Sequence, residues 1–201
     1  MTGNSKTVPA AVLLWLLAAC LGAPTTSAQV PSPTADTTEK GAPYVPTPEH
    51  VVRRMLRLAD VSGQDVVYDL GSGDGRIVIL AAQEFGARGV GVEIDSQLVQ
   101  KARRNAEQAG VSHLVEFRRD NLFDVSLADA TVVTLYLWPD MNNRLRPKLR
   151  RELGPGDRVV SHSFDIDGWE PDTTVSLESS AMSGVPKTLF RWTLPVSRGT
   201  P

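Results

Sequence analysis

The sequence predicts an α/β domain built on a doubly wound, mostly parallel seven-stranded sheet with an antiparallel edge strand near the carboxyl terminus. Three observations lead to this fold class. An apolar strand at 66–70 runs into a turn at 71–75 with glycine at every second position, and a helical stretch follows at 76–85. A second apolar strand at 89–93 completes a β-α-β unit. Strands and helices then continue to alternate, which is typical of a parallel sheet covered by helices.

Local signals explain where each element begins and ends. The stretch 76–85 carries apolar residues at helical spacing and stops before Gly86. The helix expected at 97–109 follows Asp95, which suits a helix N-cap, and stops at Gly110. Further strands are expected at 114–117, 130–137, 158–163, 173–177 and 189–194, and a further helix at 142–153 despite Pro147. The apolar stretch 130–137 is typical of a central parallel strand that is buried on both faces.

The first residues have the features of an export segment. Lys6 precedes an apolar run at 8–23, and small residues suit cleavage after Ala28, so 1–28 is expected to be a signal peptide. The run is shorter than the roughly 20 apolar residues that a bilayer helix needs, which favours cleavage over a retained membrane anchor. The sequence Leu17-Ala18-Ala19-Cys20 also resembles a bacterial lipobox, so lipidation of Cys20 is an alternative.

The segments on either side of the run indicate where the domain lies. Lys6 comes before the apolar run and the next basic residue after it is Lys40, so the positive-inside tendency places the rest of the chain outside. We therefore expect an exported or envelope-associated protein, periplasmic or lipid-anchored, with an uncleaved membrane anchor as the alternative. Residues 29–42 are rich in Pro, Thr and Ala and are expected to be a flexible linker, 43–195 the folded domain and 196–201 a tail.

The composition disfavours several classes of function. The formal net charge is −2 and there is no long basic run, which argues against a nucleic-acid partner. The basic residues at 144–151 are typical of a solvated helix face, with an acidic partner or anionic lipid as the alternative. The single cysteine, Cys20, lies outside the expected domain, so no thiol nucleophile or zinc cluster is expected. His50 and His113 lack ligand spacing, and no metal site is expected.

The turn at 71–75 has the features of a nucleoside-cofactor loop. Alternate glycines let the backbone approach a ligand, and the following helix presents free amide groups. Asp69 ends the strand, where its carboxylate can receive the ammonium group of S-adenosylmethionine, a group that a dinucleotide lacks. Glu93 ends the second strand, close to the roughly 20-residue interval at which an acid meets ribose hydroxyls. Arg76 stands where a dinucleotide loop needs its third glycine, which disfavours that ligand. A plain strand-to-helix turn, with Glu93 as a helix cap, is the structural alternative.

Several motifs together carry a resemblance to a known family. The superfamily motifs are Asp69-Leu70-Gly71-Ser72-Gly73-Asp74-Gly75, Glu93 and Asp120-Asn121-Leu122-Phe123, which resemble class I S-adenosylmethionine-dependent methyltransferases with their Rossmann-like fold. The narrower motifs are Pro43-Tyr44-Val45-Pro46-Thr47-Pro48, Gly91-Val92-Glu93-Ile94, Arg158-Val159-Val160-Ser161-His162 and Trp169-Glu170-Pro171. These are similar to the mitochondrial protein-lysine methyltransferases that modify the ADP/ATP carrier and the ATP synthase c subunit, and to their bacterial relatives. The resemblance covers roughly 43–171.

The resemblance implies a set of cofactor-binding residues. Asp69 and the backbone of Gly71, Ser72, Gly73 and Gly75 would hold the methionine part of S-adenosylmethionine. Glu93 would hold both ribose hydroxyls. At the adenine, Asp120 beside Asn121 would accept from the amino group, with Leu122 or Ile94 against the ring, and an ordinary turn carboxylate is the alternative for Asp120. Tyr44 to Thr47 would fold over the cofactor as an entrance segment, unless they form a proline-stiffened linker.

The acceptor side depends on residues at the ends of two later strands. Tyr136, Trp138 and Asp140 are candidates to line the target channel, since aromatic rings attract a methylated ammonium group. His162 is a candidate to assist deprotonation of a lysine. Plain core aromatics and a buried, hydrogen-bonded histidine are the alternatives. Methyltransferases that act on amide or adenine nitrogen often carry Asn or Asp, two prolines and an aromatic residue here, and the sequence Trp138-Pro139-Asp140 disfavours that chemistry.

We therefore expect a methyltransferase that acts on a lysine side chain of a protein partner, with a small-molecule acceptor as the alternative within the class. A different class stays open, because the cofactor is made in the cytosol and the chain carries an export signal. This second class is a non-catalytic binding protein of the envelope on a methyltransferase-like fold. The sequence gives no oligomeric state.

Overall fold

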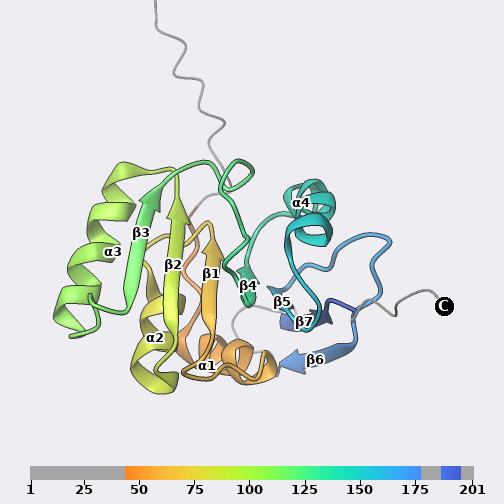
Figure 1. The fold of residues 1–201 in the computed structure, drawn as a ribbon, viewed down its shortest axis with the longest axis horizontal. Coiled ribbons are helices and arrows are strands. Elements are labelled where there is room, and N and C mark those ends of the chain that lie inside the picture. Colours follow the sequence, from red (N-terminus) through yellow and green to blue (C-terminus); the bar gives the residue numbers. More distant parts are fainter. Residues whose placement is uncertain (1–43, 178–186, 196–201) are drawn as a thin grey trace, which may run out of the picture. The chain divides into compact units, whose positions relative to one another are not determined.

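The computed structural model describes residues 44–177 and 187–195, and confirms the expected α/β fold (Figure 1). The signal peptide, Cys20, the linker and the tail predicted above lie outside the described residues. The elements in chain order are α1 (Glu49–Leu58), β1 (Val66–Leu70), α2 (Arg76–Phe85), β2 (Arg88–Glu93), α3 (Ser96–Gln108), β3 (Val115–Arg119), β4 (Val132–Leu135), α4 (Pro139–Glu152), β5 (Arg158–His162), β6 (Thr173–Leu177) and β7 (Lys187–Thr193). None of the helices in these two ranges is long and apolar enough to cross a membrane.

The seven strands form a single mixed sheet in the order β3-β2-β1-β4-β5-β7-β6. The first five are parallel, and β7 runs antiparallel between β5 and the edge strand β6. The expected antiparallel edge is therefore confirmed. The strand order reverses between β1 and β4, so the carboxyl ends of these two strands open a crevice of the kind in which α/β proteins bind ligands.

Alternate residues of the central strands enter two cores on opposite faces of the sheet. On one face, Val67 packs with buried side chains of α1, α2 and α3. On the other face, Tyr68 and Leu70 pack with buried side chains of α4 and of the connection that follows β3. Every residue of β1 and of β4 is buried, as expected for central strands. The two cores fix the register of the strands and with it the positions of their carboxyl ends.

Several boundaries differ from the sequence-based expectation. Helix α4 begins at Pro139, earlier than expected, because a proline suits the first helical position after the N-cap Trp138. Strand β5 ends at His162, since Ser163 adopts a left-handed backbone with φ 69°. Strand β4 is shorter than expected and leaves Tyr136 and Leu137 in the connection to α4. The connection from β4 to α4 therefore consists of residues 136–138 alone.

Helix α1 is an element that the patterns above do not predict. It follows the proline-rich segment at 43–48, with Pro48 at its N-cap, and it buries Val51, Val52, Met55 and Leu56 against the first core. These positions have helical spacing, so the apolar periodicity was present in the sequence. The helix anchors the entrance segment at its carboxyl end.

Candidate active site

The glycine turn connects β1 to α2 at the crevice. Gly71, Gly73 and Gly75 all have positive φ, at 84°, 53° and 80°. The amides of Gly71 and Ser72 donate to the Val92 carbonyl at 2.8 and 2.9 Å, which ties the turn to the end of β2. Gly73 is required by a close contact, because a Cβ there would lie 2.4 Å from the Tyr44 ring. The turn thus has one backbone conformation that only glycine permits at this position.

Asp69 is a buried carboxylate beside this turn. It is 3% exposed, and the Thr134 hydroxyl of the neighbouring strand β4 donates to its Oδ1 at 2.8 Å. Burial raises the pKa of Asp69 to about 7, with a smaller contribution from the negative charges of Glu93 and Asp74. The ligand-free site therefore binds a proton near neutral pH, and a cationic ligand group would favour the ionised form.

The Ser72 hydroxyl is buried in the same turn. Its Oγ has no hydrogen-bond partner among the residues that the structure describes. A buried hydroxyl normally has such a partner, so an unpaired one beside Asp69 is a group to which a polar ligand can bind. Together, Asp69 and Ser72 fit the amino-acid part of the cofactor that the sequence resemblance implies.

Glu93 connects the end of β2 to the turn. Its Oε2 accepts from the Gly73 amide at 2.9 Å, and its Oε1 accepts from the amides of Ile94 and Asp95 at 2.9 and 3.0 Å. A carboxylate has about four acceptor positions, so these three amides leave one for a ribose hydroxyl. A second hydroxyl would need one of the amides to withdraw. Glu93 is not the cap of α3, because Asp95 holds that position and accepts from the amides of Gln97 and Leu98.

The loop after β3 lies beside Glu93. The Asp120 amide donates to the Glu93 carbonyl at 3.2 Å, and the Asp120 carboxylate accepts from the Asn121 amide at 2.8 Å. Both side chains are exposed, whereas Leu122 is half-buried and packs against the second core. Ile94, also half-buried, follows the neighbouring strand β2. An exposed acid and two apolar side chains are therefore available next to the ribose position, as a purine ring requires.

The entrance segment lies on the glycine turn. The Tyr44 ring contacts Gly73, and the Lys101 ammonium lies 5.5 Å from the centre of this ring. Burial and a hydrogen bond to Asp74 raise the pKa of the Tyr44 hydroxyl. Thr47 is buried, and its carbonyl accepts from Arg76 Nη1 at 2.9 Å. The structure thus brings Tyr44 and Thr47 to the predicted cofactor loop.

Aromatic rings lie beyond the carboxyl ends of β4 and β5. The rings of Tyr136 and His162 lie 4.2 Å apart at the ends of β4 and β5, and His162 is fully buried. Trp138 is 48% exposed, and its ring lies 5.7 Å from that of Phe164. Asp140 is exposed in the first turn of α4. The structure therefore brings Tyr136 to His162 and places Trp138 against Phe164, a neighbour that the sequence analysis missed.

Asn142 holds this end together and was also missed. Its side chain is fully buried, and Nδ2 donates to the carbonyls of Phe164 and Asp165 at 3.2 and 3.3 Å and to Ser161 Oγ at 3.3 Å. The Ser161 hydroxyl donates to the same Phe164 carbonyl at 2.5 Å. These bonds fix the segment after the left-handed Ser163 and with it the Phe164 ring. No short sequence motif could have revealed contacts between residues so far apart in the chain.

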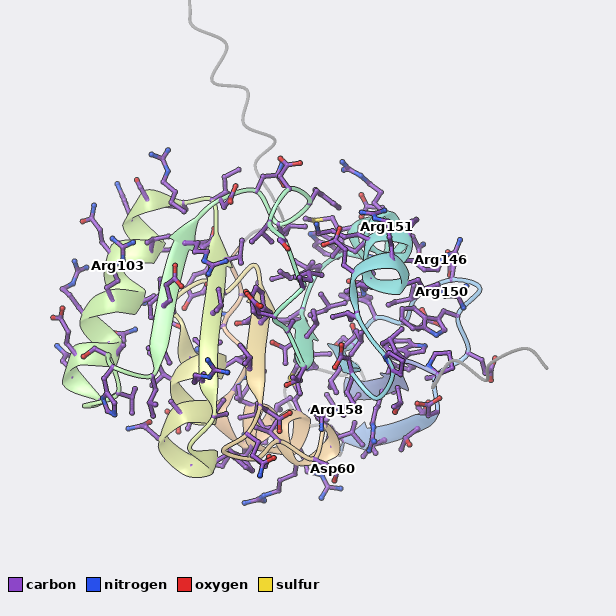
Figure 2. The ribbon with its side chains drawn as sticks, viewed as in Figure 1. Asp60, Arg103, Arg146, Arg150, Arg151 and Arg158 are labelled. Atoms are coloured by element: carbon purple, nitrogen blue, oxygen red, sulfur yellow. The ribbon has the colours of Figure 1, made fainter. Side chains whose placement is uncertain are left out.

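Helix α4 carries Arg146, Arg150 and Arg151, which are labelled in Figure 2. Each makes a contact within the domain. Arg146 donates to the Asp167 carbonyl, Arg150 lies 5.0 Å from the centre of the Trp169 ring, and Arg151 pairs with Glu152 at 2.7 Å. Arg146 and Arg150 thus connect α4 to the segment that follows β5, whereas the partner of Arg151 lies in α4 itself. Among residues 44–177 and 187–195, no group of three His, Cys, Asp or Glu side chains is placed to hold a metal ion.

The family model and the relatives that match this chain are all methyltransferases. A family model described as the ANTKMT methyltransferase domain matches residues 69–173. The chain is 50% identical over 142 residues to a protein-lysine N-methyltransferase of Saccharolobus islandicus, which covers 70% of this chain and 88% of the relative. It is 42% identical over 134 residues to the adenine nucleotide translocase lysine N-methyltransferase of Mus musculus, covering 66% of this chain and 58% of that relative. The chain thus spans little more than half the length of this animal relative.

A solved structure is also similar. It is described as an RNA methyltransferase from Salinibacter ruber in complex with S-adenosyl-L-homocysteine. The two chains are 58% identical, with a TM-score of 0.71, and the match covers 78% of this chain and 97% of that one.

Proposed function

Because the chain belongs to the ANTKMT methyltransferase domain family, we propose that it transfers a methyl group from S-adenosylmethionine to the side-chain amine of a lysine in a protein. One observation carries this proposal. The crevice between β1 and β4 has carboxylates and a buried free hydroxyl on one side, and grouped aromatic rings on the other. The first side suits an amino acid joined to a nucleoside, and the second suits an alkylammonium group.

The residues on the cofactor side have separable roles. S-adenosylmethionine supplies an electrophilic methyl group on a sulfonium. Asp69 would pair with the ammonium group of its amino-acid part, and the Ser72 hydroxyl would hydrogen-bond to the same part. Glu93 would accept from a ribose hydroxyl, and Asp120 from the adenine amino group. These contacts fix the direction of the methyl group, and alignment is the main requirement of a direct transfer.

The acceptor side must receive a lysine amine without its extra proton. Tyr136, Trp138 and Phe164 would hold the alkyl chain and attract the ammonium form by cation–π interaction. Asp140 is exposed at the start of α4, where it would accept the proton and pass it to water. His162 is fully buried behind Tyr136, so it would act by fixing that ring.

Labelled methyl transfer tests this function. The full chain is incubated with methyl-labelled S-adenosylmethionine and either an unfractionated protein extract or total RNA, because the solved relative is described as an RNA methyltransferase. We expect label in protein, recovered as methyllysine after acid hydrolysis, and its loss in Asp69→Ala and Glu93→Ala variants that remain folded. Label in RNA alone, or no label from protein that binds the cofactor, would contradict the lysine proposal.

We also propose that the protein is exported, on the basis of Lys6, the apolar run at 8–23 and the small residues before Gln29. Cell fractionation followed by analysis of the mature amino terminus tests this. A terminus at Gln29, or an acylated terminus at Cys20, would support an envelope location. An intact amino terminus in the soluble cytosolic fraction would contradict it.

A further inference from the structure

We propose that Arg76 is a positioning residue that latches the entrance segment at 44–47 onto the glycine turn, and so controls how long the cofactor stays bound. This inference rests on the proposed function, because it concerns the same cofactor site. Arg76 begins α2 directly after the turn, and nothing in the transfer itself requires it. Its role is read from the two segments that its guanidinium joins.

The Arg76 guanidinium makes three hydrogen bonds. Nε and Nη2 donate to the two carboxylate oxygens of Asp74 at 2.9 and 2.8 Å, in the bidentate geometry that gives strong, directional pairs. The remaining nitrogen, Nη1, donates to the Thr47 carbonyl at 2.9 Å. One side chain therefore connects the glycine turn, through Asp74, to the backbone of the entrance segment.

Asp74 is the centre of this latch. It is 6% exposed, its carbonyl accepts from Asn105 Nδ2 at 2.9 Å, and the Lys101 ammonium lies 3.6 Å from its carboxylate. Burial alone would raise the pKa of Asp74, but its hydrogen bonds with Arg76 and Tyr44 hold it at about 2. The Asp74 carboxylate is thus ionised at neutral pH.

Tyr44 is held at the other end of the same network. Its ring packs on Gly73, Lys101 lies over the ring, and the nearby Asp74 carboxylate helps to raise the pKa of its hydroxyl. The ring rests on the turn that would bind the methionine part of the cofactor. Movement of 44–47 away from the turn must therefore break the Arg76–Thr47 bond and the contacts of Tyr44 together. We expect such movement to set the rate at which a bound ligand leaves, and to have less effect on the rate of methyl transfer.

The chain offers a matched control on the same surface. Asp74 and Arg76 line an open hollow of about 600 Å³ between α1, α2 and α3, and Arg53 lines it too. Arg53 also makes two hydrogen bonds to carboxylates, with Glu84 at 2.6 Å and with Glu49 at 3.0 Å. Its partners belong to α1 and α2, and no bond joins it to the turn or to Thr47 in the described structure. The two arginines thus differ in what they connect.

The first test measures the dissociation rate of S-adenosylhomocysteine from the full chain. Arg76→Lys keeps the charge but has one nitrogen in place of the three that reach Asp74 and Thr47. Because an ammonium group cannot reproduce the fork geometry of the guanidinium, we expect dissociation to become about tenfold faster. The double variant Asp74→Asn with Arg76→Gln removes both charges and leaves no unpaired buried carboxylate, and we expect a similar acceleration. Arg53→Lys should leave the rate unchanged.

The second test needs no cofactor. The amides of Val51 and Val52 donate to the Pro48 carbonyl in the first turn of α1, directly after Thr47. Their hydrogen exchange in the ligand-free protein should become faster in both Arg76 variants and stay at the parent level in Arg53→Lys. A dissociation rate that is unchanged in folded Arg76→Lys would overturn the proposal, whatever the exchange shows. If the parent chain binds no S-adenosylhomocysteine, the proposed function fails instead, and unchanged exchange in the Arg76 variants would then reject the latch separately.

Discussion

The two ends of the crevice are built in different ways. At the cofactor end, the Gly73 amide donates to the Glu93 carboxylate within one β-α-β unit, and the Asp69 carboxylate is held by the Thr134 hydroxyl of the neighbouring strand β4. At the acceptor end, the Tyr136 ring packs on His162 and the Trp138 ring on Phe164, and the buried Asn142 holds the segment after β5 in place. The first end has a backbone geometry fixed by local sequence, and the second depends on tertiary contacts.

The two constructions match the two molecules that the crevice would bind, the cofactor and the acceptor. The cofactor is one molecule of constant shape, so a preorganised set of donors and acceptors binds it with little loss of conformational freedom. The acceptor amine arrives on a larger partner, and ring surfaces bind an alkyl chain with less demand on its orientation. Changes at the first end should therefore alter cofactor affinity, and changes at the second end should alter only the reaction with the acceptor.

The largest effect is expected from Gly73→Ala. A Cβ at this position would lie 2.4 Å from the Tyr44 ring at φ 53°, so the turn or the entrance segment must move. Calorimetry should show a loss of affinity for S-adenosylhomocysteine of about 100-fold, equivalent to about 3 kcal/mol. The control is Gly110→Ala at the end of α3, where φ is also positive, at 72°, but no atom lies within 4 Å.

Gly110→Ala should cost about 1 kcal/mol of stability and leave the affinity unchanged. Equal loss of affinity in the two variants would mean that the strained backbone, and not the contact with Tyr44, limits binding.

The next effect is a pH dependence of cofactor binding at Asp69. Its pKa is about 7 in the ligand-free protein, and an ammonium group favours the ionised form. Below pH 7 a proton must leave before the ligand binds, so affinity for S-adenosylhomocysteine should fall about tenfold per pH unit between pH 7 and pH 5. Asp69→Asn should remove this slope and weaken binding at pH 7.5. A parent affinity that is constant over this range would contradict the assignment.

The same residue predicts a change in stability. The folded pKa of Asp69 lies above its value of 3.8 in the unfolded chain, so the folded state binds more protons and stability falls as the pH rises from about 4 to 7. Above pH 7, the buried charge costs up to about 4 kcal/mol. Denaturant unfolding at pH 8 should therefore show that Asp69→Asn is more stable than the parent. A variant less stable than the parent would show that burial of the ionised Asp69 carboxylate does not destabilise the fold.

A smaller effect is expected at the acceptor end from Trp138→Ala. Removing the half-exposed ring that packs with Phe164 should lower kcat/KM for a lysine-containing protein about tenfold, through lost apolar and cation–π contact. The affinity for S-adenosylhomocysteine should not change. Trp138→Phe keeps a ring and should retain most of the activity. Weakened cofactor binding in Trp138→Ala would show that the two ends are not independent.

The smallest effect on the reaction is expected from Asn142→Leu. The change removes the amide that holds the carbonyls of Phe164 and Asp165, so the Phe164 ring gains freedom. We expect KM for the protein acceptor to rise about threefold and the free energy of unfolding to fall by about 1–3 kcal/mol. An Asn142→Leu variant with reduced stability and an unchanged KM would assign Asn142 to the fold alone.

More of the cofactor end than of the acceptor end could be predicted from the sequence. Asp69, the glycine turn and Glu93 follow one another along the chain, so strand ends and turn chemistry place them without knowledge of the tertiary structure. Phe164 and Asn142 could not be predicted, because their roles depend on contacts between α4 and the segment after the left-handed Ser163. Helix α1 was missed although Val51, Val52, Met55 and Leu56 have helical spacing.

The most direct test of the central claim is a calorimetric titration of the full chain with S-adenosylhomocysteine, for the parent and for Glu93→Ala. The claim is that the carboxylates of Asp69 and Glu93, at the carboxyl ends of β1 and β2, bind the cofactor. It predicts micromolar affinity for the parent and a loss of at least about tenfold in Glu93→Ala, which loses the ribose contact and the support of the Gly73 amide. A folded Glu93→Ala variant that binds as tightly as the parent would contradict it.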